Sequence, residues 1–420
     1  MMTVVFLLLF TKTADAHAFD LQKEMDAAKE GAEIVIPKGR YEGSFTIRKS
    51  ITLKGSSETE LVALGEEPVI RIEDVQDVVI ENLSITTQNK AILANDATGL
   101  TLVQLTIRHV HTGIYLQRTK DVLLQNLTIT GRDGHYSKKG NGIAIYKSED
   151  VVVENSAIQQ VQDGIYIEDV ERIAVTNNTV QNSRYGTHFM YTNDADVQKN
   201  MFSHNVTGLM IMMTTSLYVA RNELVNHADL NGYGMLLFDV QQTQLKNNRI
   251  IGNRTGVSLQ KSTAIRIEQN DFQMNQTAIE GTQVDDETQV MANQFTGNIL
   301  TARSDQKGFR LVKNYYDDYS GMDIDMDGKG DTPYVAVSSF GQWMVRKPVY
   351  QYFVESPSVT LLTIIDTQIN KLEKNVLVDG EPLMVRKQNE VKTKNQDVAQ
   401  LMVGLFVLFS SVWLWRRGMK

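Results

Sequence analysis

The chain has 420 residues, of which 42% are apolar, and a formal net charge of −8 at pH 7. This acidic balance argues against nucleic acid as a partner, because a surface that binds nucleic acid must neutralise phosphates with lysine and arginine. The sequence contains no cysteine. That absence excludes disulfides and thiolate metal ligands, so a soft metal site would have to use methionine and histidine.

The N-terminal segment is typical of an exported protein. An apolar run over residues 4–10 is followed by a small-x-small triplet at 14–16, which predicts a secretory signal peptide over residues 1–16. Export would place the rest of the chain outside the cytoplasm. Residues 21–30 have helical spacing and end at Gly31, so the segment 17–68 is predicted to hold a helical cap and the first coils of a solenoid.

Residues 69–316 are organised by a repeat. A small residue followed by an aliphatic-x-aliphatic strand recurs eight times, and five of the seven intervals are 22 residues. These small residues are Gly113, Gly142, Gly164, Gly186, Gly208, Gly234, Gly256 and Ala278. The period-2 alternation predicts short strands with one inward-facing side. The fold class is therefore predicted to be all-β, a right-handed parallel β-helix with coils of about 22 residues.

Asparagines recur in step with the glycines. They are Asn155, Asn178, Asn200, Asn222, Asn248, Asn270, Asn293 and Asn314. Asparagine tolerates left-handed backbone geometry, and its amide can bond to the backbone of a neighbouring coil. The column therefore predicts a ladder of turns along one corner of the solenoid.

The strand alternation also indicates which side chains face out. On four consecutive coils the outward pairs are Tyr166/Glu168, His188/Met190, Met210/Met212 and Leu236/Phe238. Because stacked coils lie about 4.8 Å apart, the two middle pairs should form a two-by-two cluster. Imidazole and thioethers suit Cu(I), so one hypothesis is a Cu(I) site. The other is an apolar face that docks a partner, including Tyr166, Leu236 and Phe238.

An acidic turn motif opens the segment 317–355, which is predicted to close the solenoid. Three of its carboxylates alternate and a fourth follows two glycines: Asp323, Asp325, Asp327 and Asp331. This spacing resembles the first half of an oxygen-ligand Ca²⁺ loop. Tyr334 stands where the helix-loop-helix type of loop has glutamate. The alternative hypothesis is an acidic, hydrogen-bonded turn without a metal ion.

The C-terminal part is predicted to contain a membrane anchor. Residues 356–397 are expected to form a short helical region and a polar, lysine-rich linker. Residues 398–415 carry no charge and precede Arg416 and Arg417, which predicts a transmembrane helix with a cytoplasmic tail at 416–420. A buried C-terminal helix is the alternative.

Four segments together resemble the NosD family of extracytoplasmic β-helix proteins, which take part in nitrous oxide reductase maturation. They are RYGTHFMYTNDADVQKN (184–200), GLMIMMTTSLYVARNELVNHADLNGYGMLLFDV (208–240), NYYDDYSGMDIDMDGKGDTPY (314–334) and EPLMV (381–385). The resemblance extends over roughly residues 17–387. It implies a periplasmic, non-enzymatic role in denitrification, as a copper relay or assembly platform. The implied partners are the membrane and ATPase subunits of an ABC transporter, a copper chaperone, and nitrous oxide reductase as client.

Two other functions are compatible with a β-helix. A carbohydrate-active protein, pectate lyase-like or a uronate epimerase, would need clustered Asp, Arg or Lys on an outward strand, whereas the strand described above presents mainly Tyr, His, Met, Leu and Phe. A surface adhesin or structural solenoid is the other alternative, and its gene would not be expected beside genes for an ABC transporter and a copper chaperone. Fold alone does not decide between these functions.

Overall fold

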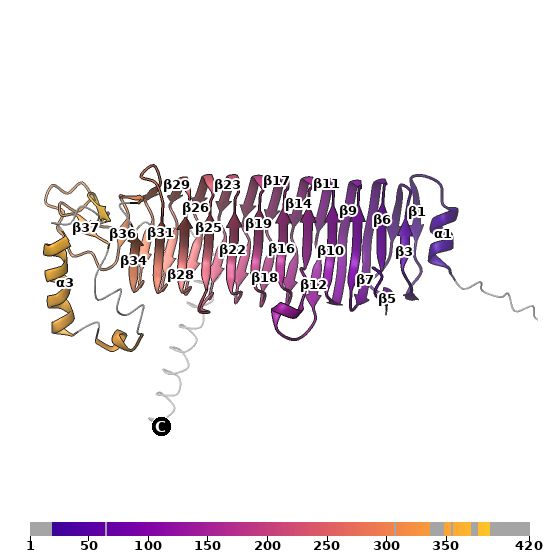
Figure 1. Ribbon diagram of the computed structural model, residues 1–420, viewed down its shortest axis with the longest axis horizontal. Coiled ribbons are helices and arrows are strands. Elements are labelled where there is room, and N and C mark those ends of the chain that lie inside the picture. The colour runs from indigo at the N-terminus through magenta and orange to yellow at the C-terminus, as the bar shows by residue number, and fades with distance from the viewer. Residues whose placement is uncertain are drawn as a thin grey trace, which may run out of the picture. The chain divides into compact units, whose positions relative to one another are not determined.

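The computed structural model describes residues 19–63, 65–305, 308–336, 348–353, 356–370 and 377–386. These residues confirm the predicted right-handed parallel β-helix (Figure 1). The predicted signal peptide and the predicted span at 398–415 lie outside the described residues. Within the described part of the chain, no helix is long and apolar enough to cross a membrane.

One face of the solenoid is a parallel sheet of 12 strands, called here the front sheet. Its strands are β3 (Phe45–Ile47), β6 (Ile70–Glu73), β8 (Lys90–Asn95), β10 (Thr112–Gln117), β13 (Ile143–Tyr146), β16 (Asp163–Glu168), β19 (Tyr185–Met190), β22 (Thr207–Met212), β25 (Tyr233–Phe238), β28 (Thr255–Gln260), β31 (Thr277–Thr282) and β34 (Leu300–Ser304). The predicted inward side chains of these strands are buried, for example Ile165, Phe189 and Leu209 at 0% exposure. Their burial forms the core of the molecule.

The other two faces belong to a sheet of 26 strands. One ladder runs through β1 (Ala32–Val35), β4 (Ile51–Lys54), β7 (Gln76–Thr87), β9 (Thr98–Val110), β11 (Lys120–Gln125), β14 (Glu149–Glu154), β17 (Glu171–Thr176), β20 (Asn193–Gln198), β23 (Thr215–Ala220), β26 (Gln241–Lys246), β29 (Thr263–Glu268), β32 (Gln289–Met291), β35 (Arg310–Val312) and β38 (Val378–Asp379). The second runs through β2 (Gly39–Glu42), β5 (Thr59–Ala63), β7, β9, β12 (Thr128–Gly131), β15 (Ala157–Gln159), β18 (Thr179–Gln181), β21 (Met201–Ser203), β24 (Glu223–Val225), β27 (Arg249–Ile251), β30 (Asp271–Gln273), β33 (Gln294–Thr296) and β36 (Tyr315–Tyr316). Strands β7 and β9 are long enough to take part in both ladders.

The first coil is covered by α1 (Leu21–Ala27), which ends earlier than the predicted 21–30. The side chain of Asp20 caps its N-terminus by accepting from the Lys23 N–H, and Leu21 and Met25 are buried. Gln22 bonds to the backbone of Thr46 in β3 through both its amide nitrogen and its amide oxygen. The helix therefore covers an end of the core that would otherwise meet solvent.

The far end of the solenoid is closed by a segment from much later in the chain. After β36 the chain forms β37 (Tyr334–Val335), η2 (Pro348–Phe353) and α3 (Pro357–Asn370). It then returns as β38, which is parallel to β35 and antiparallel to β37. The range 356–397, expected to hold a helix and a linker, thus also supplies the last strand of the first ladder.

The asparagine column forms a buried ladder, as its spacing indicates. In each step the side-chain oxygen of one asparagine accepts the backbone N–H of the residue one coil earlier, as Asn200 does from Asn178 at 2.8 Å. Two details of the prediction are wrong. The first rung is Ser156 rather than Asn155. The left-handed residue is the one before each rung, such as Asn177 with φ 57° or Lys199 with φ 55°, because the corner turns there.

A second ladder runs parallel to the first, five residues further along each coil. Its members are Ser183, Asn205, His227, Asn253, Asn275 and Asn298. His227 is fully buried, and its Nδ1 lies 2.9 Å from the Asn205 carbonyl oxygen. Among the described residues its Nε2 has no hydrogen-bond partner. His227 therefore interrupts a ladder that asparagine would continue.

We expect His227 to make the solenoid acid-sensitive. Burial lowers the pKa of His227 from 6.5 to about 4, so the folded protein resists protonation while the unfolded chain does not. Stability is therefore fully present above about pH 6.5 and is lost as the pH falls towards 4, by about 3 kcal/mol in total. Urea unfolding at a series of pH values should show this slope in the wild type and lose it in His227→Asn. An unchanged slope in the variant would assign the acid sensitivity to other groups.

Candidate metal-binding and docking face

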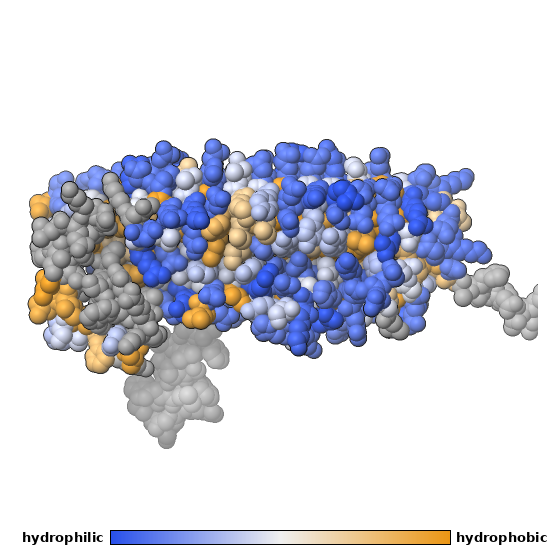
Figure 2. All heavy atoms as spheres, in the orientation of Figure 1, coloured by the Kyte–Doolittle hydropathy of each residue, from blue (hydrophilic) through white to orange (hydrophobic). Residues whose placement is uncertain are grey.

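The predicted site residues lie on neighbouring strands of the front sheet. The register pairs Tyr166 with His188, His188 with Met210, Met210 with Leu236, Glu168 with Met190, Met190 with Met212, and Met212 with Phe238. All face away from the core, and all but His188 are partly exposed. Figure 2 shows the apolar part as a pale-orange patch over β22 and β25. We call this set of eight residues the His/Met face.

His188 is the most buried member of the face, with 8% of its surface exposed. Its imidazole lies between the rings of Tyr166 and Tyr185, each edge-on with centroids 5.0 and 5.1 Å away. Its Nδ1 lies 3.1 Å from a carboxylate oxygen of Asp163. Its Nε2 is buried and has no hydrogen-bond partner within the described residues. An imidazole nitrogen in this state is available to a ligand.

Asp163 is itself buried and is held by Arg184. The guanidinium donates from Nε and Nη2 to the two carboxylate oxygens, at 2.8 and 2.7 Å. Burial alone would raise the pKa of Asp163, but the hydrogen bonds from His188 and Arg184 outweigh it, so the pKa lies below its usual value. Arg184 also lies over the Tyr185 ring, 4.3 Å from its centroid. The carboxylate is therefore ionised at neutral pH.

Tyr166 connects His188 to the methionines. Its hydroxyl lies 2.6 Å from a carboxylate oxygen of Glu168 and 3.3 Å from the sulfur of Met190. Burial, followed by the contact with Glu168, raises the pKa of Tyr166 well above its usual value. The phenol thus stays protonated, and its hydroxyl contacts the thioether sulfur of Met190.

The remaining members of the face give it a soft and apolar character. Met210 and Met212 are half-buried and pair in register with Leu236 and Phe238. Lys261 lies 5.4 Å from the centre of the Phe238 ring. Neutral imidazole with several thioethers is a ligand set that favours Cu(I). An apolar rim next to it suits contact with another protein.

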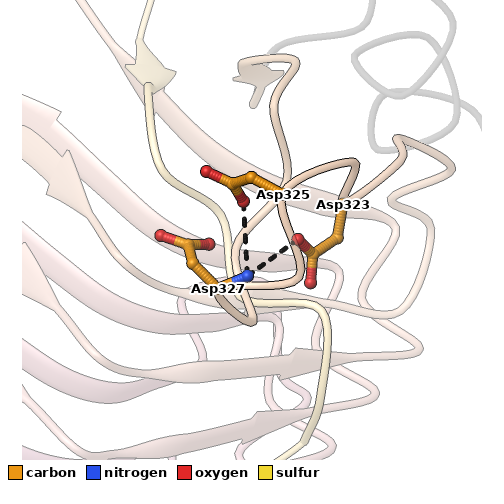
Figure 3. A group of neighbouring side chains, drawn as sticks. All are labelled: Asp323, Asp325 and Asp327. Atoms are coloured by element: carbon orange, nitrogen blue, oxygen red, sulfur yellow. Dashed lines mark hydrogen bonds between the residues drawn. The ribbon is translucent and has the colours of Figure 1, made fainter.

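The acidic turn motif forms a separate cluster near the C-terminal end of the solenoid. Carboxylate oxygens of Asp323, Asp325 and Asp327 lie within 4.8 Å of one another (Figure 3). Asp323 accepts from the backbone N–H groups of Asp327 and Gly328. Asp331, predicted as a fourth ligand, lies outside this group, and its carboxylate accepts from the backbone of Ile324. The motif is therefore a hydrogen-bonded turn with three converging carboxylates.

Sequence patterns missed Asp163, Arg184 and Tyr185. In the register, Asp163 belongs to a column that continues through Tyr185, Thr207, Tyr233, Thr255 and Thr277. A carboxylate directly before one of the repeating glycines, where the following coils have uncharged residues, is the signal that could have identified it. Arg184 lies 21 residues later, about one coil, and so lies beside it.

The fold defines the class, the right-handed parallel β-helix proteins, and the outward side of the front sheet presents histidine and methionine on adjacent coils. A family model described as "Periplasmic copper-binding protein (NosD)" matches residues 125–326. Over this segment, just under half of the chain, the sequence is similar to the NosD family. A second model, described as "Rhamnogalacturonase A/epimerase, pectate lyase-like", matches residues 12–211.

Two curated relatives are similar over most of their length. The "Probable ABC transporter binding protein NosD" of Pseudomonas aeruginosa is 26% identical, over 82% of this chain and 86% of the relative. The protein of that name from Stutzerimonas stutzeri is 25% identical, over 86% and 89%. Among solved structures, a PL6 alginate lyase in complex with a trisaccharide has a TM-score of 0.55 and 13% identity, over 70% of this chain and 81% of the lyase. At this identity the likeness shows the shared fold.

Proposed function

We propose that this chain is a non-enzymatic assembly factor for nitrous oxide reductase, which receives Cu(I) on the His/Met face and passes it on. It works outside the cytoplasm with the membrane and ATPase subunits of an ABC transporter. The family description as a periplasmic copper-binding protein supports the location and the metal. The relatives' names as ABC transporter binding proteins support the transporter as partner.

One observation supports copper binding most directly. The buried Nε2 of His188 lacks a partner among the described residues, and the strand that carries His188 also carries Met190 and pairs with the strand of Met210 and Met212. A free imidazole nitrogen beside thioethers on adjacent coils is a soft, uncharged ligand set. Such a set binds Cu(I) without requiring cysteine.

The same face would also dock the protein that donates or receives copper. Leu236 and Phe238 extend the apolar surface beyond the methionines. A copper chaperone or the reductase would bury this surface while the ion moves between the two sets of ligands. Residues 1–16, as a signal peptide, and 398–415, as a transmembrane helix, would bring the solenoid to the outer side of the membrane and hold it there.

A competition titration with a chromophoric Cu(I) chelator tests this proposal on the purified full-length protein. We expect the variant His188→Ala, Met190→Ala, Met210→Ala, Met212→Ala to lose at least ~100-fold in Cu(I) affinity, because losing even a group that only hydrogen-bonds to a ligand costs about 10–100-fold. The matched control is Met201→Ala with Met274→Ala, two exposed methionines away from this face. It should bind like the wild type.

Equal Cu(I) affinity in the wild type and the four-residue variant would overturn the copper role and leave the face as a docking surface. Circular dichroism of the variant shows whether it is folded.

The acidic turn motif is a separate proposal, a structural Ca²⁺ site formed by Asp323, Asp325 and Asp327. Adding Ca²⁺ should raise the thermal unfolding temperature of the wild type and leave that of Asp325→Asn unchanged.

Carbohydrate processing is the second candidate function, favoured by the match to the pectate lyase-like model. The charged residues that the structure adds to the face do not form an open catalytic site. Asp163 is 1% exposed and bonded to both Arg184 and His188, so a sugar cannot reach its carboxylate. We expect no cleavage or epimerisation of uronate polymers, measured by reducing ends and by proton NMR of the polymer.

A further inference from the structure

We propose that Asp163, fixed by Arg184, is the positioning residue that makes His188 a metal ligand. Asp163 holds the proton of His188 on Nδ1 and leaves the lone pair of Nε2 free for Cu(I). This inference rests on the proposed function. It names two residues that do not touch the metal ion but decide whether the imidazole can.

The tautomer of His188 follows from what surrounds each ring nitrogen. Both oxygens of Asp163 accept hydrogen bonds from Arg184, and an ionised carboxylate has no proton to give. The short contact between Asp163 and Nδ1 therefore requires the proton to be on Nδ1. If Nε2 were protonated as well, its N–H would be buried without an acceptor among the described residues, which costs free energy. The neutral form with the proton on Nδ1 is thus favoured.

Arg184 holds both oxygens of the Asp163 carboxylate in place. This bidentate contact fixes the oxygen that lies 3.1 Å from the Nδ1 of His188, and it compensates the buried negative charge of Asp163. The guanidinium is partly exposed, with 28% of its side chain accessible, so its own hydration limits the cost of burying the pair.

The surrounding rings fix the direction of the imidazole. Tyr166 and Tyr185 contact it edge-on from two sides, and the bond to Asp163 stops rotation about the ring's own axis. The imidazole ring is therefore ordered before copper binds. Copper binding is then not weakened by the entropic cost of ordering this side chain. A carboxylate that accepts the second ring N–H is also one of the usual groups that orient histidine ligands of metals and raise their basicity.

The test combines a tautomer measurement with a metal titration on the full-length protein. Selective ¹⁵N labelling of the seven histidines allows the protonation of each ring nitrogen to be read at pH 8 without metal, with His188→Ala assigning the signals. We expect wild-type His188 to carry its proton on Nδ1 alone. Asp163→Ala should mix the two tautomers and lower Cu(I) affinity by about 10–100-fold. Asp169→Ala, an exposed aspartate directly after the end of the same strand, is the matched control and should change neither.

The possible outcomes distinguish a failure of this inference from a failure of the proposed Cu(I) binding. If Asp163→Ala shifts the tautomer but binds Cu(I) as tightly as the wild type, Asp163 has no positioning role. A wild-type His188 protonated on Nε2 would overturn the inference outright. If the His188→Ala protein alone binds Cu(I) with undiminished affinity, the proposed copper site fails, whatever the tautomer. Circular dichroism and the unchanged signals of the other histidines confirm that the Asp163 variant is folded.

Discussion

Gly186→Ala is expected to destabilise the solenoid by roughly 3 kcal/mol, the upper end of the usual range for overpacking. A Cβ at Gly186 would lie 2.4 Å from the carbonyl oxygen of Gly208 and 2.4 Å from Cδ1 of Phe202. The first contact is with the backbone of the next coil and the second with a fully buried ring, so neither neighbour can move without disturbing the stack. At Gly164 and Gly208, the equivalent glycines of the neighbouring coils, an added Cβ would likewise lie too close to the backbone carbonyl oxygen of the next coil.

Urea unfolding followed by circular dichroism measures this effect as a lower midpoint. The matched control is Gly65→Ala, since a Cβ at Gly65 would meet nothing within 4 Å, and its midpoint should stay close to that of the wild type. Because each coil contacts only its neighbours, the loss is expected to be local and to broaden the transition. A midpoint unchanged in Gly186→Ala would mean that the coils can separate to admit a methyl group.

Asp379→Ala is expected to cost about 3–5 kcal/mol, because it removes the acceptor that ends the asparagine ladder. One carboxylate oxygen accepts from the Asn314 backbone and side-chain N–H groups and from the Tyr316 hydroxyl, at 2.9–3.0 Å. The other accepts from the backbone N–H groups of Lys313 and Glu381. Asp379 is completely buried, so these donors would lose their partner without gaining water.

The comparison with Asp379→Asn separates this role from a general effect of β38. Asparagine keeps one acceptor oxygen and repeats the chemistry of the other rungs, so we expect a loss of only about 1 kcal/mol. Thermal unfolding of the two variants beside the wild type measures the difference. Equal destabilisation by alanine and asparagine would show that the negative charge, rather than the acceptor, matters at this position.

The sequence predicts those features that repeat with the coil. The alternation around Gly164 and Gly186 correctly predicts the inward side chains, and the asparagine spacing predicts the first ladder. These predictions succeed because each coil places equivalent residues above one another, so one local pattern determines many contacts. The same regularity, applied at an offset of five residues from the first ladder, would have revealed the second ladder and shown His227 as its exception.

Other features depend on contacts that do not repeat from one coil to the next, so the repeat in the sequence does not predict them. Asp163, Arg184 and His188 meet because three side chains on two coils adopt particular rotamers, and the alternation specifies only which way each points. The shift of the ladder from Asn155 to Ser156 depends on the backbone conformation of the corner. The return of β38 could not be predicted from spacing, because a long non-repeating excursion separates it from β35.

The late position of β38 has a consequence for how the molecule is made. A chain that is synthesised from its N-terminus can stack its early coils while later residues are still being added. The last rung cannot close until Asp379 has emerged, since Asp379 pairs with Leu311. Until then the C-terminal edge of the sheet presents unpaired backbone groups, which favour aggregation. A chaperone that assists folding would therefore need to protect this edge until the residues between β36 and β38 have been synthesised.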